Sequence, residues 1–342
     1  MKAINPNGSR VNLSPDDSLR SALDLVHNPN LKVLQFHQML PLALLEGLNS
    51  EFFTQRPDVE LRAFGFYGDI CDLAFCALMS NVERFRADCL QQAKGVENIS
   101  RMRNLTSLGI GIWNLDSFAF LNEINRNVSA MWLTQTKSKK PDLSPLSRFL
   151  NLQSLCLAGQ QKSIEIVSQL TSIEELTLIS VALKSLDFIR ALPQLNSFAL
   201  SLGGTKNLSA LSGMSALKKL ELWKILGLEN IEVVSSLTGL ETILLQSLIR
   251  VSSLPPLDKL INLRKVVLDD MKGLTDISAL TTAPVLNELS HVGSRLPIED
   301  YLPLLRKGTL KTANVGFGSL TKNGKFHAHC EKYGVLNSVA YK

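Results

Sequence analysis

The chain has 342 residues, of which 45% are hydrophobic and 20% charged, and its net charge at pH 7 is +5. These proportions exclude an intrinsically disordered chain, and the charge is too small to support a nucleic-acid-binding protein. The start has no apolar stretch typical of a secretory signal, and the most apolar run, residues 39–48, is too short to span a bilayer. Five cysteines without a CxxC pair favour a reduced, cytoplasmic protein.

The first expected elements are two helices on either side of a strand. In LSPDDSLRSALDLV, residues 13–26, Ser14 is a suitable N-cap and Pro15 fits the first helical position. The motif LKVLQF then begins at Leu31, and a second helix is expected in LALLEGLNSEFFTQ, residues 42–55. We therefore predict that residues 1–58 form an N-terminal helical cap with a first divergent repeat.

After this cap, a motif of the form LxxLxL recurs along the chain. Its copies begin at Leu61, Val82, Leu105, Val128, Leu152, Ile173, Leu195, Leu217, Leu240 and Leu263, with weaker ones at Leu286 and Leu310. The eleven steps from first to last cover 249 residues, roughly 22.6 residues a step. Between the motifs, apolar residues recur every three positions, as at Leu183, Leu186 and Ile189, which favours 3₁₀ turns or a short helix. Such units bury their apolar faces by stacking into a solenoid.

This repeat resembles the leucine-rich repeat superfamily, and its short unit is most similar to the repeats of internalins and of protein-phosphatase-1 regulators. The resemblance covers residues 59–316, about twelve repeats. It implies an α/β solenoid, a horseshoe with a concave parallel β-sheet, convex 3₁₀ or short helices, and helical caps. One departure stands out: the Asn that the family places three positions after the strand motif is missing from eleven copies. The turns must therefore satisfy their backbone groups in another way.

The last segment, residues 317–342, is predicted to be a C-terminal cap. A helix ending at Gly334 and a final edge strand are expected there. The cluster HAHC within it places His327 and Cys330 on one helical face, but two ligands without a third make a poor zinc site. In GSLTKNGKF, residues 318–326, the glycine spacing is wrong for a phosphate-binding loop. We therefore expect no catalysis, cofactor or metal.

Side chains of a strand alternate between the two faces of a sheet, which separates the core positions of each motif from outward-facing ones. Trp223, Leu244 and Val267 should lie near one another on strands about 4.8 Å apart. Exposed apolar and aromatic residues rimmed by charge are typical of a protein-binding hot spot. The predicted partner-binding residues are Tyr67, Arg84, Arg86, Asp88, Trp132, Ile179, Glu221, Trp223, Leu244, Val267 and Asp269.

The function expected from the resemblance and these positions is a non-catalytic cytoplasmic module that binds a partner protein on its concave face. This function fits a bacterial-type adaptor, a phosphatase regulator or an immunity-like inhibitor. The protein is expected to be a monomer on its own, with no nucleic-acid or membrane partner. A surface adhesin of the internalin type and an enzyme with its site in the caps are the alternatives. The outward apolar residues could also serve strand propensity alone. The basic loop TKSKKPD, residues 136–142, is expected to be solvated.

Overall fold

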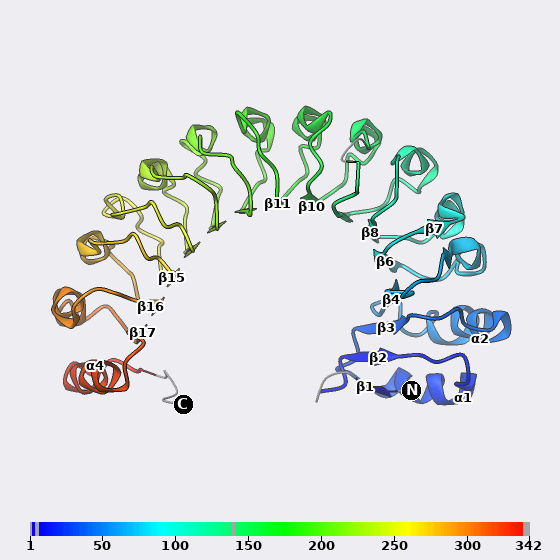
Figure 1. Ribbon diagram of the computed structural model, residues 1–342, viewed down its shortest axis with the longest axis horizontal. Helices are drawn as coiled ribbons and strands as arrows, with labels where there is room; N and C mark the ends of the chain where they lie inside the picture. Colours follow the sequence, from blue (N-terminus) through cyan, green and yellow to red (C-terminus); the bar gives the residue numbers. More distant parts are fainter. Residues whose placement is uncertain (1, 4–6, 139–140, 338–342) are drawn as a thin grey trace. The chain divides into compact units, whose positions relative to one another are not determined.

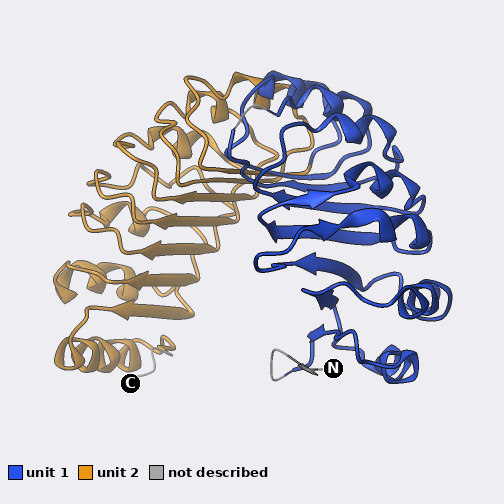
Figure 2. Ribbon diagram, turned by 45° about the vertical axis from the view of Figure 1, so that its right-hand side comes forward, with its two compact units in different colours: residues 1–173 blue, residues 174–342 orange. Residues whose placement is uncertain are grey.

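The computed structural model describes residues 2–3, 7–138 and 141–337, and the chain divides into two compact units, residues 1–173 and 174–342 (Figure 2). In each unit, a sheet of short strands lies on one side and the helical returns lie on the other (Figure 1). This is the solenoid architecture that the repeat predicts. The basic loop lies partly outside the described residues, at 139–140.

Unit 1 has one main sheet whose strands follow chain order. They are β1 (Lys2–Ala3), β2 (Arg10–Asn12), β3 (Val33–Phe36), β4 (Glu60–Phe64), β6 (Arg84–Leu90), β8 (Ser107–Ile112), β9 (Ala130–Leu133) and β10 (Ser154–Ala158). β1 is antiparallel to β2, and the other neighbours are parallel. A small second sheet joins β5 (Cys71–Asp72) to β7 (Ala93–Lys94).

The helices of unit 1 are short. α1 (Leu19–Leu23) and α2 (Leu42–Gly47), which continues into a π-helical turn at Leu48–Phe52, lie near the N-terminus. One 3₁₀ segment follows α1, at Asp24–His27, and the others form the later returns, at Leu73–Leu78, Val96–Arg101, Ala119–Glu123, Ser144–Arg148 and Ile164–Gln169.

Unit 2 has a fully parallel sheet. Its strands are β11 (Glu175–Ile179), β12 (Ser197–Ser201), β13 (Lys219–Trp223), β14 (Thr242–Gln246), β15 (Lys265–Asp269), β16 (Glu288–Val292) and β17 (Thr312–Gly316). The 3₁₀ returns are Asp187–Ala191, Ser209–Leu211, Glu232–Ser236, Ser278–Thr281 and Ile298–Tyr301. Two α-helices close the chain, α3 (Leu302–Arg306) and α4 (Leu320–Lys332).

The core of each unit consists of the consensus aliphatic side chains. In β13, for example, Leu220 and Leu222 are fully buried, while Glu221 and Trp223 on the other face are partly exposed. Burial of one leucine side chain stabilises the fold by about 2 kcal/mol, and each repeat contributes several such residues. The sequence motif therefore identifies the core correctly in this strand.

The register of β4 differs from the expectation. Leu61 pairs with Phe85, so it occupies the second consensus position of its repeat, not the first. Ala63 is the next buried residue, and Phe64, expected in the core, lies on the opposite face. Ala63 fits a core or a variable position equally well, which left two registers open in the sequence. As a consequence, Tyr67 lies in the loop after β4 and not in the strand column predicted for it.

The N-terminal helix begins later than predicted. The hydroxyl of Ser18, not that of Ser14, caps it by accepting a hydrogen bond from the Ser21 amide at 3.2 Å. The reason is strand pairing: the Leu13 amide still donates to the Gln35 carbonyl at 2.7 Å, so the chain is extended up to the position where a helix was expected. Both β2 and β3 thus extend the sheet beyond β4 toward the N-terminus.

The C-terminal helix agrees with the prediction. The Ser319 hydroxyl accepts from the Lys322 amide at the start of α4, and Gly334 follows the helix with φ of 68°. Leu336 then bridges to Thr312 in parallel fashion. The rest of the predicted edge strand, residues 338–342, lies outside the described residues.

In unit 2, the turns after β11, β12, β13, β14 and β15 replace the missing Asn with a left-handed residue directly after the strand. These residues have φ between 48° and 56° and are Ser180, Leu202, Lys224, Ser247 and Asp270. Each donates its amide to a carbonyl at the end of the next strand, as Leu202 does to Trp223 at 3.0 Å. Backbone geometry therefore satisfies these groups.

The variant Leu202→Gly is expected to be about 1 kcal/mol more stable than Leu202→Ala, because both lose the partly buried leucine side chain and only glycine relieves the left-handed strain. The left-handed conformation destabilises a residue that has a side chain by about 1–2 kcal/mol, and glycine relieves this strain. The greater freedom of glycine in the unfolded chain offsets only part of the relief. Urea unfolding of Leu202→Gly measures the change, with Leu202→Ala as a control that keeps the strain. Equal stability of the two variants would contradict the explanation.

Candidate partner-binding surface

The surface of interest is the free face, which we define as the face of each unit's sheet that points away from its helical returns. In unit 2, Leu244 lies directly beside Val267 on the neighbouring strand, and Glu221 lies beside Leu244 on the other side. Trp223 lies on the same strand as Glu221, two residues further on, and therefore on the same face of the sheet. All four side chains are partly exposed. The structure thus brings these predicted residues together.

The edges of this cluster are polar. Trp223 pairs with Gln246, whose side-chain amide donates to Asp269 at 2.8 Å. Ile179 lies at the level of Trp223 but two strands away, with Ser201 between them. The cluster is therefore a small apolar surface with a fixed hydrogen bond at one side.

In unit 1 the free face is built around an arginine pair that the sequence only half revealed. Arg62 and Arg86 are direct cross-strand neighbours. Asp88 lies 2.7 Å from Arg62 and 3.9 Å from Arg86, so one carboxylate holds two guanidinium groups. Arg62 was missed because of the wrong register at β4, and aligning Ala63 with Ala87 would have found it.

Polar contacts continue this group across the neighbouring strands. Arg62 also donates to the Gln35 side chain at 2.8 Å, and the amide of Gln35 donates to Asn12 at 2.7 Å. A further ion pair joins Arg86 to Glu60 at 3.2 Å. The result is a continuous polar network over β2, β3, β4 and β6.

Trp132 contacts this network across the adjacent strand, at a position where that strand carries no side chain. The Arg86 guanidinium lies 4.5 Å from the centre of the Trp132 ring, although β8 separates their strands. Gly109 of β8 makes this possible, because a Cβ there would lie 2.7 Å from Arg86 Cγ. A cation–π contact of this kind contributes roughly 0.5–2 kcal/mol. Trp132 is thus held in place while 42% of it stays exposed.

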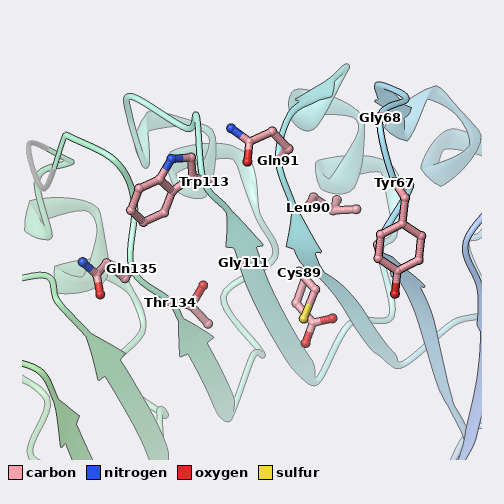
Figure 3. Close-up of a pocket in the computed structure, with 11 residues that line it drawn as sticks. Tyr67, Gly68, Cys89, Leu90, Gln91, Gly111, Trp113, Thr134 and Gln135 are labelled. Carbon is pink, nitrogen blue, oxygen red and sulfur yellow. The ribbon is translucent and has the colours of Figure 1, made fainter. Parts of the chain in front are cut away.

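A hollow of about 770 Å³ lies at the ends of β6, β8 and β9, with Tyr67 and Trp113 among its lining residues (Figure 3). Tyr67 is 82% exposed and reaches the hollow from its loop. Gly111, which also lines the hollow, lies between Asp88 and Thr134, since a Cβ there would be 2.8 Å from a side-chain atom of each. Trp113 was not among the predicted residues; its position after a β-strand was the only signal.

Three of the cysteines are unsuited to act as nucleophiles at neutral pH. Burial raises the pKa of Cys71 and Cys156 to about 12 and that of Cys330 to about 11, so these thiols are protonated at neutral pH. Within the described residues, no three His, Cys, Asp or Glu side chains are grouped to hold a metal ion. His327 lies 3.4 Å from Glu331. No helix in the described ranges is long and apolar enough to cross a membrane.

Comparison with known proteins gives a result for the fold only. No family model matches the chain. No curated protein matches its sequence. Among solved structures, an internalin (InlF) of Listeria monocytogenes is similar at 18% identity and a TM-score of 0.52, covering 98% of this chain and 87% of that one.

Two further structures are similar. The functional domain of InlJ from Listeria monocytogenes has 17% identity and a TM-score of 0.51, covering 85% of this chain and 59% of that one. Drosophila Toll, in its complex with Spatzle, has 14% identity and a TM-score of 0.55, covering 90% of this chain and 46% of that one. The chain therefore has the leucine-rich-repeat fold that its repeats predict.

Proposed function

We propose that the chain is a non-catalytic, cytoplasmic module that binds a partner protein on the free face of its sheet. The observation that carries this proposal is the cluster of Trp223, Leu244 and Val267, whose partly exposed apolar side chains lie on neighbouring strands beside Glu221 and Asp269. Tryptophan at the centre of a polar rim is typical of binding hot spots. Toll, a protein of the same fold, forms a complex with Spatzle.

The finer assignment is an adaptor, regulator or immunity-like inhibitor in a bacterial cell, monomeric without its partner. Five unpaired cysteines support a reducing compartment. The second candidate is a surface adhesin, favoured by the similarity to the Listeria internalin. Cell fractionation separates the two, because the adhesin would be found with the cell envelope and the module in the cytoplasmic fraction.

The test of partner binding is the double variant Trp223→Ala/Leu244→Ala. A partner captured from native lysate with the wild-type chain is purified and its affinity measured by calorimetry. We expect the double variant to bind at least about 30-fold more weakly, because truncation of a hot-spot residue costs about 2 kcal/mol or more.

The matched control is Leu226→Ala/Ile249→Ala. These side chains are 69% and 60% exposed, but they lie in the turns after β13 and β14. They should leave the affinity within about twofold, as most peripheral contacts do. Equal affinity of the Trp223→Ala/Leu244→Ala variant and the wild type, with both folded by circular dichroism, would mean that the outward apolar residues serve the strands alone.

A further inference from the structure

A basic hollow lies on unit 1, on the same side of the sheet as the arginine pair. It encloses about 510 Å³, and its lining combines only two carboxylates with five cations, Arg10, Lys32, Arg62, Arg84 and Arg86. The lining therefore has an excess of three positive charges, compared with +5 for the whole chain. Across the strands, a row of equivalent positions holds two cations and one carboxylate, which are Arg10 on β2, Arg84 on β6 and Glu60 on β4.

The carboxylates around the hollow are already engaged by arginines. The three ion pairs are Arg56–Asp58 at 2.8 Å, Arg86–Glu60 at 3.2 Å and Arg62–Asp88 at 2.7 Å. Lys32 and Arg84 are exposed, and neither forms an ion pair with another residue in the described part of the chain. Two accessible cations are thus available to a ligand.

On the buried side of the hollow, the arginine side chains are held by several contacts. Like charges directly opposite on neighbouring strands destabilise a sheet, yet Arg62 and Arg86 hold this arrangement. Asp88 contacts both guanidinium groups, and the Trp132 ring packs against that of Arg86. Because these guanidinium groups are already positioned before a ligand binds, binding of an anion costs little side-chain entropy.

We propose that this hollow receives an acidic segment of the partner protein, whose Asp or Glu carboxylates pair with Arg84 and Lys32. The inference rests on the proposed function, because it names the chemistry of a partner on the same face. The excess of positive charge on the lining attracts anionic side chains, and Asp and Glu supply these in a protein without any modification. Guanidinium groups also match the planar carboxylate in a bidentate geometry.

The experiment uses fluorescein-labelled hexaglutamate as the probe, with the full chain titrated at low salt and fluorescence anisotropy as the readout. The variant Lys32→Glu/Arg84→Glu should bind the peptide at least about tenfold more weakly, because two attractions become repulsions. Added salt should weaken binding by the wild type. A second variant, Lys32→Gln/Arg84→Gln, should show a smaller loss and guards against effects of charge reversal on folding.

The matched control is Lys184→Glu/Lys206→Glu, which makes the same charge change at two exposed lysines of unit 2. It should bind hexaglutamate like the wild type. No binding by the wild type, or an equal loss in the control, would overturn the proposal. Stronger binding at Arg84 and Lys32 by a phosphorylated peptide of equal charge would overturn it in favour of a phosphate ligand.

The two proposals can fail separately. A partner lost from the Trp223→Ala/Leu244→Ala variant, with no binding of hexaglutamate, leaves the proposed function standing and removes the acidic segment. Site-specific binding of hexaglutamate, with a captured partner that the double variant retains, supports the basic hollow and overturns the role of Trp223.

Discussion

Replacing Gly203 by alanine is expected to destabilise the protein by about 3 kcal/mol, at the upper end of the usual cost of overpacking. Gly203 follows the left-handed residue Leu202 in the turn after β12, and a Cβ there would lie 2.0 Å from the Val181 carbonyl oxygen. This neighbour is backbone, so it cannot rotate away. Any shift would also strain the bond from the Leu226 amide to the Gly203 carbonyl, now 2.9 Å long.

The adjacent glycine supplies the control. A Cβ on Gly204 would meet only the Ala182 Cβ at 3.6 Å, an ordinary contact. Gly204→Ala should therefore be neutral or stabilise by up to about 1 kcal/mol, because alanine lowers the entropy of the unfolded chain. Urea unfolding of both variants at matched m-values measures the difference. Similar midpoints for the two would show that the turn adapts and that the close approach at Gly203 has no consequence.

Acid is expected to destabilise unit 2 through His291, a buried residue of β16. Its ring replaces the aliphatic residue of the repeat, between Leu268 and Val315 of the neighbouring strands, and it is only 1% exposed. The ring Nδ1 lies 2.7 Å from the Tyr301 hydroxyl, which in turn lies 2.7 Å from the Ser294 hydroxyl. Burial lowers the pKa of His291 to about 4, because the charged imidazole loses its hydration.

The direction of the change in stability with pH follows from the pKa values of His291 in the unfolded and in the folded chain. Below pH 6.5 the unfolded chain binds a proton on this histidine, whereas the folded chain does not until the pH nears 4. Stability is therefore full above that range and falls by about 1.4 kcal/mol for each pH unit within it, or roughly 2 kcal/mol at about pH 5. The full loss, reached near the lower pKa, is about 3 kcal/mol.

Comparison with His291→Gln isolates this contribution from the other titrating groups. Glutamine can still hydrogen-bond to the Tyr301 hydroxyl but does not titrate, so the variant should be less stable at neutral pH and lose about 2 kcal/mol less between about pH 7.5 and about pH 5. Urea unfolding at both pH values gives the comparison. The same pH dependence in both proteins would contradict a buried neutral histidine.

Much of the fold could be predicted from the sequence because the repeat is regular. The spacing of Leu217, Leu220 and Leu222 identifies the strand and its core face, and it places Trp223 outside the core. Since successive copies pair one for one in unit 2, the same alignment also puts Leu244 beside Val267. Binding by these residues is a separate prediction that the measurements above test.

The errors arose where the local pattern allowed two solutions. At β4, Ala63 suited either face, and only pairing with Ala87 decided the register. At the N-terminus, Ser14 was expected to cap the helix, and the hydrogen bond from Leu13 to the neighbouring strand excluded this start.

The sequence by itself determined the strands, their order and the faces of most side chains, because these follow from a period within one repeat. Only the tertiary structure decided which of two adjacent glycines, Gly203 or Gly204, faces a carbonyl. It also decided that Arg86 crosses Gly109 to reach Trp132. Such contacts join residues about one repeat or more apart. They depend on the stacking distance and on side-chain shape, which the local sequence pattern does not contain.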